Sequence, residues 1–268
     1  MVRPISQTNI ALNRAPVIAN GVSFSPDDIA SLSAWWDPDD GTTLTQSAAP
    51  QVDAMDDKTG GGAGFSQITG RGLPDLVTIG DRNWLQFVAA SSEGMRVPSD
   101  ALSGILFGAD EMTIALVFRT STSTGQTLLN KGSNTQGRWR MRVSHTAAGD
   151  VQGVLNDGTT NYPVDGSTGS DDGDPHLFVL IRDNAANLMR LRKDSAEVAT
   201  LDITGCGSTD ETAQAAWLST LLLGCQPAGA STGQHWNGEI GEILFYQDML
   251  EGSDLTNMEA YLSAKWGV

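Results

Sequence analysis

Apolar and polar side chains alternate in short runs along most of the chain, which is typical of strands with one buried face. In the clearest run Arg138, Arg140 and Arg142 alternate with Trp139, Met141 and Val143. Such runs predict strands at residues 84–88, 112–120, 127–132, 138–145, 151–157, 176–183, 188–194, 198–204, 218–225 and 238–246. Polar, glycine-containing segments such as NDGTTN and DGSTGSDDGDP separate them and predict turns. Strands without intervening helices predict an all-β protein, a sandwich or barrel of antiparallel sheets.

Two segments have the wider spacing of a helix. Residues 208–217 show it weakly, whereas the C-terminal segment DLTNMEAYLSAKWGV shows it clearly. Ser253 is a suitable N-cap, and apolar side chains then recur at Leu255, Met258, Leu262 and Trp266. We therefore expect a C-terminal helix whose apolar face docks on the sandwich and seals its edge.

Length and charge narrow the class of protein. A chain of 268 residues can form one large β domain, and no apolar run is long enough to span a bilayer. The formal net charge of -16 would repel nucleic acid phosphates and anionic membranes. We therefore expect neither a nucleic acid partner nor membrane insertion.

The first residues differ from the rest because they carry no core-forming pattern. Residues 1–25 are polar and interrupted by proline, and they lack the apolar segment of a secretory signal peptide. We interpret them as an N-terminal arm, followed by one domain at residues 26–268. The arm could lie along a neighbouring subunit or dock on its own domain.

Cys206 and Cys225 are the two cysteines of the chain. They are too few for a disulfide framework and do not have the spacing of a zinc site. Two unbridged thiols and a single bridge between neighbouring strands both stay open.

The segment WNGEIGEILFYQDMLEGSDLTNMEAYLSAKWGV resembles the closing segment of concanavalin A-like, laminin G-like jelly-roll domains. The matching residues are Gly238, Ile240, Glu242, Ile243, Tyr246, Leu250, Tyr261, Leu262, Lys265, Trp266 and Gly267. Upstream, LSAWWDPDDGTTLT, VDAMDDKTGGGAGFSQ, NWLQFVAASSEGMRVP, MTIALVFRTSTSTGQTLLNKG and HLFVLIRDNAANLMRLRKDSAEVATL resemble other segments of that family in the same order. The last of these lacks the glycine at which the family often turns. The resemblance implies a jelly-roll sandwich from about residue 26 onward.

Some members of this superfamily hydrolyse glycosidic bonds with two carboxyl groups that flank the scissile bond. The nearest pair here is Glu239 and Glu242, which a regular strand would place on opposite faces. His145, His176 and His235 have neither a metal-binding nor a nucleophile-activating spacing. We therefore expect that the protein is not an enzyme.

Sugar sites in this fold often combine aromatic rings, amides or acids, and calcium. Trp139, Tyr162 and Trp236 are the candidate glycan contacts, with core packing as the alternative interpretation. Two acid-rich turns have the composition of a calcium site. They are Asp37, Asp39 and Asp40, and Asp171, Asp172 and Asp174. Neither has the spacing of an EF-hand, and acidic turns without an ion are the alternative. We expect no cofactor, with calcium at Asp171, Asp172 and Asp174 as the one exception to test.

Single-domain proteins with this jelly roll and this type of tail resemble structural proteins of bacteriophages. The resemblance implies a capsid decoration, head fibre or tail attachment protein that is made in the host cytoplasm and displayed on the virion surface. Residues 1–25 would then bind other virion proteins, and the chain would form a homo-oligomer such as a trimer. The alternative function is a carbohydrate-binding, lectin-like module, and a host-surface glycan is an expected partner in either case.

Overall fold

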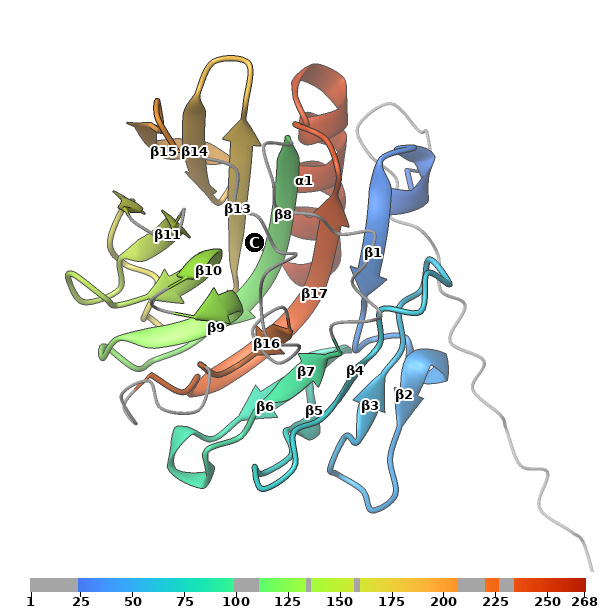
Figure 1. Cartoon of the computed structure of the whole chain (residues 1–268). Coiled ribbons are helices and arrows are strands. Elements are labelled where there is room, and N and C mark those ends of the chain that lie inside the picture. The colour runs from blue at the N-terminus through green and yellow to red at the C-terminus, as the bar shows by residue number, and fades with distance from the viewer. Residues whose placement is uncertain (1–23, 99–110, 134–135, 157–159, 207–219, 227–233) are drawn as a thin grey trace, which may run out of the picture.

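Two antiparallel sheets packed face to face form the body of the protein (Figure 1). The computed structural model describes residues 24–98, 111–133, 136–156, 160–206, 220–226 and 234–268. An eight-stranded sheet has the order β15-β14-β13-β8-β17-β6-β5, with β1 paired to β17. A nine-stranded sheet has the order β12-β11-β10-β9-β16-β7-β4-β3-β2. The prediction of an antiparallel β-sandwich is confirmed.

The eight-stranded sheet consists of β1 (Leu32–Trp36), β5 (Asp75–Ile79), β6 (Arg82–Phe87), β8 (Met112–Arg119), β13 (His176–Asp183), β14 (Leu188–Lys193), β15 (Ala196–Asp202) and β17 (Gly238–Tyr246). The nine-stranded sheet consists of β2 (Leu44–Thr45), β3 (Ala54–Met55), β4 (Phe65–Gln67), β7 (Met95–Val97), β9 (Gln126–Ser133), β10 (Gln136–Val143), β11 (Val151–Asn156), β12 (Asn161–Asp165) and β16 (Leu221–Leu223). The remaining described elements are the 3₁₀ helices η1 (Pro26–Asp28), η2 (Gly41–Thr43) and η3 (Ala89–Ser91) and the α-helix α1 (Gly252–Trp266).

The predicted strands agree closely with the observed ones. β13 and β17 have the predicted bounds, and most other predicted strands shift by one or two residues at an end. The strands that the pattern missed are short or lie near a sheet edge: β1 to β5, β7 and β12. The helix predicted at residues 208–217 lies outside the described residues. The turn between β13 and β14 uses Asn187 at a φ of 52° in place of the missing glycine, and asparagine tolerates that left-handed conformation.

The main core lies between the two sheets. In β10 the side chains of Trp139, Met141 and Val143 are buried in it, as the alternation predicts. Alternate residues of the same strand, Arg140 and Arg142, therefore lie on the outer face of the nine-stranded sheet, the face turned away from its partner sheet. This outer face becomes important for the candidate site.

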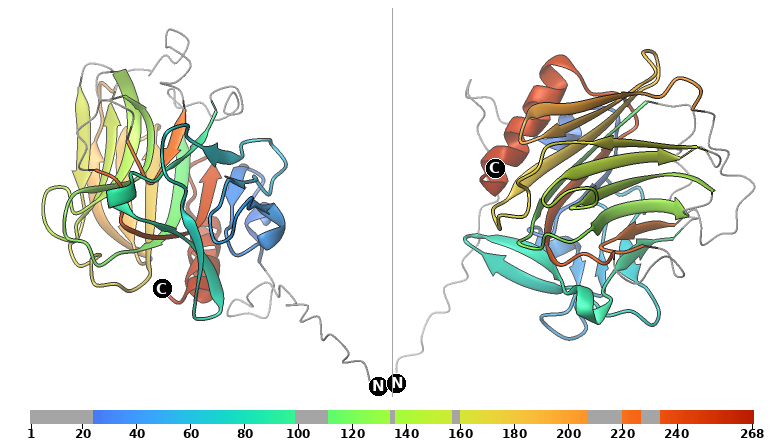
Figure 2. Two further views of the ribbon diagram at one scale, coloured as in Figure 1. Left: turned by 90° about the horizontal axis from the view of Figure 1, so that it is seen from below. Right: turned by 90° about the vertical axis from the view of Figure 1, so that its left-hand side faces the viewer.

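Helix α1 packs on the outer face of the eight-stranded sheet (Figure 2). Its residues Met258, Leu262 and Trp266 are buried in a second apolar cluster with residues of β8, β13 and β17. The docking prediction is confirmed, but the helix covers a face and does not seal an edge. The predicted cap is also wrong, since the helix begins at Gly252 with Glu251 as N-cap and Ser253 lies inside the first turn.

A buried polar network joins α1 to the sheet beneath it. Glu242 of β17 is fully buried and accepts hydrogen bonds from Trp35 Nε1 at 2.6 Å, Tyr261 Oη at 3.0 Å and Trp266 Nε1 at 3.0 Å. Its carboxylate also pairs with Lys265 Nζ at 2.8 Å. Burial raises the pKa of Glu242, and these four partners satisfy its oxygens. Residues that carry the jelly-roll resemblance thus form the joint between helix and sheet.

The network continues into the acidic turn after β1. Lys265 Nζ lies 2.7 Å from Asp37 Oδ2, which also pairs with Lys58 Nζ at 3.1 Å. Burial alone would lower the pKa of Lys265, but the charges of Glu242 and Asp37 outweigh it, so the pKa is raised and the amine stays protonated. Three segments far apart in sequence therefore meet in one ion-paired cluster.

Cys206 and Cys225 are free thiols, and burial raises the pKa of Cys225 to about 11. Phe24, which we counted with the arm, is buried and its ring lies 6.0 Å from that of Tyr261. Residues 1–23 of the arm lie outside the described residues. Within the described ranges, no helix is both long enough and apolar enough to cross a membrane.

Candidate functional site

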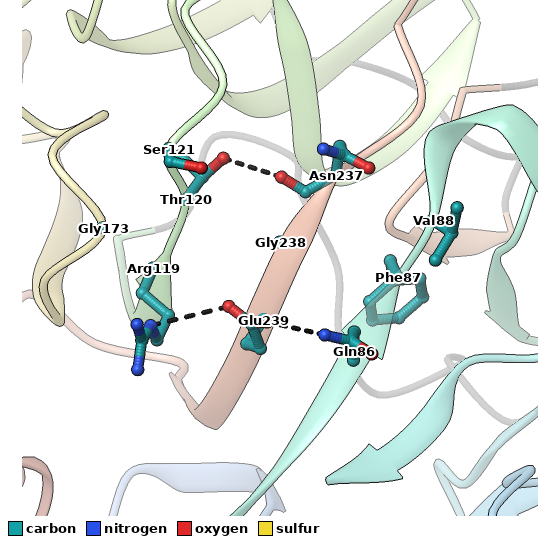
Figure 3. A pocket seen from close by; sticks show the side chains of 10 residues that line it. All are labelled: Gln86, Phe87, Val88, Arg119, Thr120, Ser121, Gly173, Asn237, Gly238 and Glu239. Carbon is teal, nitrogen blue, oxygen red and sulfur yellow. Dashed lines mark hydrogen bonds and ion pairs between the residues drawn. The ribbon is translucent and has the colours of Figure 1, made fainter. Parts of the chain in front are cut away.

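The carboxylates of Glu239 and Glu242 lie on the same face of the eight-stranded sheet, not on opposite faces as predicted. Ile240 pairs with Phe118, and Ile243 pairs with Leu116, so three steps along β17 match two along β8. This β-bulge turns both glutamates outward. Glu239 pairs with Arg119 in a surface pocket (Figure 3), whereas Glu242 is buried in its ion-paired network. The two therefore do not form an accessible carboxylate pair.

The predicted aromatic contacts belong mainly to the core. Trp139 and Trp236 are 1% and 0% exposed, so neither ring offers a free face to a sugar, and the prediction is wrong for both. Tyr162 on β12 is partly buried and packs against the main core. The alternation that identified β10 already predicts Trp139 on the buried face of the strand, together with Met141 and Val143.

The first acidic cluster is occupied by ion pairs. Asp37 and Asp40 pair with Lys58, and Asp39 pairs with Arg82 at 2.8 Å. These carboxylates stabilise the turn after β1 and the joint to α1. They are a structural feature of the fold.

One carboxylate of the second acidic cluster, that of Asp172, contacts a histidine. Asp172 Oδ1 lies 3.1 Å from His176 Nε2 and accepts a hydrogen bond from the backbone N–H of Asp174 at 2.8 Å. Across the described ranges, no group of three or more histidine, cysteine, aspartate or glutamate side chains is arranged to hold a metal ion. Calcium at Asp171, Asp172 and Asp174 stays a prediction, which a melting experiment with and without EDTA would test.

The outer face of the nine-stranded sheet carries a row of polar side chains that the sequence did not single out. Arg142 of β10 pairs with Gln152 of β11, which in turn pairs with Asp165 of β12. Residues that pair across strands point to the same face, so the three side chains lie side by side. The Gln152 amide donates a hydrogen bond to Asp165. Its oxygen is buried without a donor among the described residues.

A second row runs parallel to the first and crosses more of the sheet. Arg140 pairs with Val154 on one side and with Asn130 of β9 on the other. Asn130 pairs with Leu222 of β16, which pairs with Arg96 of β7. Together these rows define the arginine face: Arg96, Asn130, Arg140, Arg142, Gln152, Leu222 and Asp165 on the outer side of the nine-stranded sheet. Arg96, Arg140 and Arg142 give it a concentration of positive charge.

Arg140 and Arg142 form no close ion pair with a described carboxylate; the charges of Asp165 and Asp150 raise the pKa of Arg142, but burial and the charge of Arg140 outweigh them. Neither guanidinium forms an ion pair with any residue that the structure describes, and the buried Nε of Arg142 has no acceptor there. Burial lowers the pKa of both arginines, and the charge of Arg140 contributes to lowering that of Arg142 to about 10. Arg142 Nη1 lies 3.1 Å from the ring of His145, whose pKa is lowered by burial and by Arg142. A neutral imidazole cannot offset the charge.

Four arginines elsewhere in the described residues differ in this respect, whereas Arg71 and Arg96, like Arg140 and Arg142, have no described carboxylate within ion-pair distance. Each of the following lies within ion-pair distance of a carboxylate: Arg82 with Asp39, Arg119 with Glu239, Arg190 with Asp183, and Arg192 with Glu259. A protein with a net charge of -16 therefore leaves two neighbouring arginines without such a partner on one sheet face. That arrangement favours an anionic ligand, because a carboxylate, sulfate or phosphate would supply the missing charge.

Comparison with known proteins shows what the fold is similar to, but it does not assign the chain to a family. No protein-family model matches the sequence, and no curated protein matches it. The structure is similar to a binding domain of botulinum neurotoxin serotype D/C, with a TM-score of 0.57, 13% identity and 89% of this chain covered. It is also similar to a structure of botulinum neurotoxin type C, with a TM-score of 0.58 and 13% identity. Cell entry of that toxin depends on interaction with two ganglioside molecules. Each match covers 89% of this chain, and this chain spans about half, 53%, of each neurotoxin chain.

A weaker similarity is to the CBM40 module of Ruminococcus gnavus IT-sialidase bound to α2,3 sialyllactose. Its TM-score is 0.46 at 21% identity, over 56% of this chain and 82% of that one. The neurotoxin comparisons support a concanavalin A-like sandwich of two antiparallel sheets with one C-terminal helix. The serotype D/C neurotoxin structure is described as a binding domain.

The virion hypothesis depends on residues outside the described ranges. Residues 1–25 would make the attachment, and residues 1–23 of them are not described. Binding to other virion proteins, a homo-oligomer and a place on the virion surface therefore stay predictions.

Proposed function

We propose that the protein is a carbohydrate-binding, lectin-like module that has no catalytic role and holds a carboxylated sugar on the arginine face. One observation carries the proposal: Arg140 and Arg142 stand side by side on this face, and neither forms an ion pair with a described carboxylate. Arg142 is 8% exposed and lies deep in the face, whereas Arg140 is more exposed. We assign Arg140 the direct contact with the sugar carboxylate and Arg142 the supporting charge.

The neighbours of the two arginines suit a sugar better than a simple inorganic anion. A sugar acid presents one carboxylate together with several hydroxyl groups that both donate and accept hydrogen bonds. Asp165 is exposed at the end of the first row and can accept from such hydroxyls. Pro163 is exposed and lies in the second row, paired with Val154 next to Arg140, so it offers apolar contact to the C–H groups of a ring.

Whole-molecule charge restricts the size of the ligand. The net charge of -16 repels long polyanions, so the positive face would admit a short acidic sugar and disfavour nucleic acid. Cell entry of botulinum neurotoxin type C depends on two ganglioside molecules, and this neighbour favours a glycan as the class of ligand. That similarity supports the proposal by analogy of fold.

The test compares one arginine on this face with one on the other sheet. Arg140→Gln removes the contact, and Arg190→Gln is the matched control because Arg190 lies on β14 of the other sheet and pairs there with Asp183 of β13. With α2,3-sialyllactose as ligand, we expect Arg140→Gln to raise the dissociation constant by about tenfold or more, because a charge-assisted hydrogen bond is lost. Arg190→Gln should bind like the wild type. Calorimetry measures both, and equal affinity of Arg140→Gln and wild type would contradict the assignment.

A further inference from the structure

A groove lies on the opposite side of the molecule, on the outer face of the eight-stranded sheet. It consists of two adjoining pockets of about 320 Å³ and about 350 Å³ that meet at Arg119. The first is shown in Figure 3, and the second lies at the C-terminal end of α1, beside Lys265, Trp266 and Gly267. We call the two together the outer groove. It shares no residue with the arginine face.

Three polar side chains from neighbouring strands line the first pocket. Glu239 of β17 pairs with Gln86 of β6 on one side and with Arg119 of β8 on the other. Gln86 Nε2 donates to Glu239 Oε1 at 2.9 Å, and Arg119 Nε lies 3.5 Å from Glu239 Oε2. The positive and negative charges cancel, so this row has no net charge and does not favour an ion of either sign.

The row still has unused hydrogen-bonding capacity. Within the described residues, the Nη groups of Arg119, the side-chain oxygen of Gln86 and the hydroxyl of Ser121 have no hydrogen bond. These are donors, an acceptor and a group that does both. They line the pocket with Val88, whose side chain is 40% exposed, and with Gly173 and Gly238, which have no side chain.

Trp84, which carries a buried donor without an acceptor in the described part of the chain, is one of the residues that line the second pocket. Trp84 is 2% exposed, and its indole Nε1 has no hydrogen-bond partner among the described residues. A buried donor without an acceptor is unfavourable, so an acceptor that a ligand supplies would be favourable there. Trp84 and Gln86 lie on the same face of β6, two residues apart, which places the indole next to the polar row.

We propose that the outer groove is a second binding site and that its ligand is a neutral polyhydroxylated ring, such as a pyranoside. The hydroxyls of the ring would use the free groups of Arg119, Gln86 and Ser121, one ring oxygen would accept from Trp84 Nε1, and its C–H groups would contact Val88. Pockets of this size hold small organic ligands. The site stands independently of the arginine face and differs from it in ligand charge.

The experiment follows the indole N–H signals by ¹H–¹⁵N correlation spectroscopy. The probes are the methyl glycosides of galactose, glucose and mannose, and Trp84→Phe together with backbone assignment identifies the Trp84 signal. We expect at least one glycoside to shift the Trp84 indole proton downfield in a saturable manner, because a new acceptor reaches the donor. If none of the three glycosides shifts this signal, the proposal is overturned.

A blocking variant locates the binding in the groove. Ser121→Trp places a bulky ring at the exposed rim, and Ser123→Trp is the matched control on the same loop, outside the pocket lining. Ser121→Trp should abolish the shift and Ser123→Trp should keep it. A shift that persists in Ser121→Trp would contradict the site. Arg140→Gln should leave the shift unchanged, so failure of this site and failure of the arginine face are distinguishable.

Discussion

His176, the first residue of β13, lies between two carboxylates. Its Nδ1 is 2.9 Å from Asp194 Oδ2 and its Nε2 is 3.1 Å from Asp172 Oδ1. Burial and the nearby charge of Lys193 disfavour the protonated ring, but the two aspartates outweigh them and raise the pKa of His176. The folded pKa thus lies above the value of about 6.5 for a solvated histidine. The charged ring stabilises the fold below that pH, and this contribution is lost as the pH rises through the raised value.

A pH series of melting temperatures tests this account of His176. The loss of stability in His176→Gln should be larger at about pH 5.5 than at about pH 8.5, because the charged ring stabilises the fold at the lower pH and that contribution falls as the pH rises. His145→Gln is the control with the opposite sign, since burial and Arg142 lower the pKa of His145 and disfavour its charge in the fold. Removing His145 should cost least at low pH. A His176→Gln difference that does not change with pH would contradict the ion pairs.

Single residues also show where sequence reasoning stops. The alternation in β10 was sufficient to place Arg140 and Arg142 together on an outer face. Their lack of a carboxylate partner could not be predicted, because it depends on which strands neighbour β10 and on where the sixteen basic and thirty-two acidic residues of the chain fold. Trp139 shows the converse, since its position in the same pattern already indicated the core.

At the level of elements, the bulge in β17 is what the sequence pattern could not reveal. A regular strand was assumed for Glu239 and Glu242, and one extra residue reverses the conclusion about their faces. A Cβ at Gly241 would lie 3.2 Å from the ring of Trp266, so this glycine lets α1 approach the bulged strand closely. The long strands with strong alternation were predicted well, whereas two-residue strands such as β2 and β3 are too short to show a period.

Gly241→Ala tests the contact between the bulge and α1. The added methyl group must push the Trp266 ring away, and we expect a loss of about 1–3 kcal/mol in the free energy of unfolding, as for other overpacked cores. Gly41→Ala is the matched control, because a Cβ there meets no atom within 4 Å. Urea denaturation measures both variants. Equal stability of Gly241→Ala and wild type would show that the ring and helix yield without cost.

On the scale of the whole molecule, the two sheets present outer faces of different character. The eight-stranded sheet is partly covered by α1 and leaves a groove whose charges cancel. The nine-stranded sheet carries arginines without described carboxylate partners, on a protein whose net charge is -16. The closing segment that resembles the jelly-roll family joins the first sheet to its helix, through Glu242, Tyr261 and Lys265. The resemblance predicted the fold well, but it did not indicate that Arg140 and Arg142 lie without a close carboxylate among the described residues.

The most direct measurement is the affinity for α2,3-sialyllactose compared with that for its methyl ester. The ester keeps every ring and hydroxyl group but removes the negative charge that Arg140 and Arg142 are proposed to bind. The account predicts that calorimetry detects the acid and that the ester binds at least about tenfold more weakly, which corresponds to about 1.4 kcal/mol. Equal affinity for acid and ester, or no binding of the acid, would contradict the central claim.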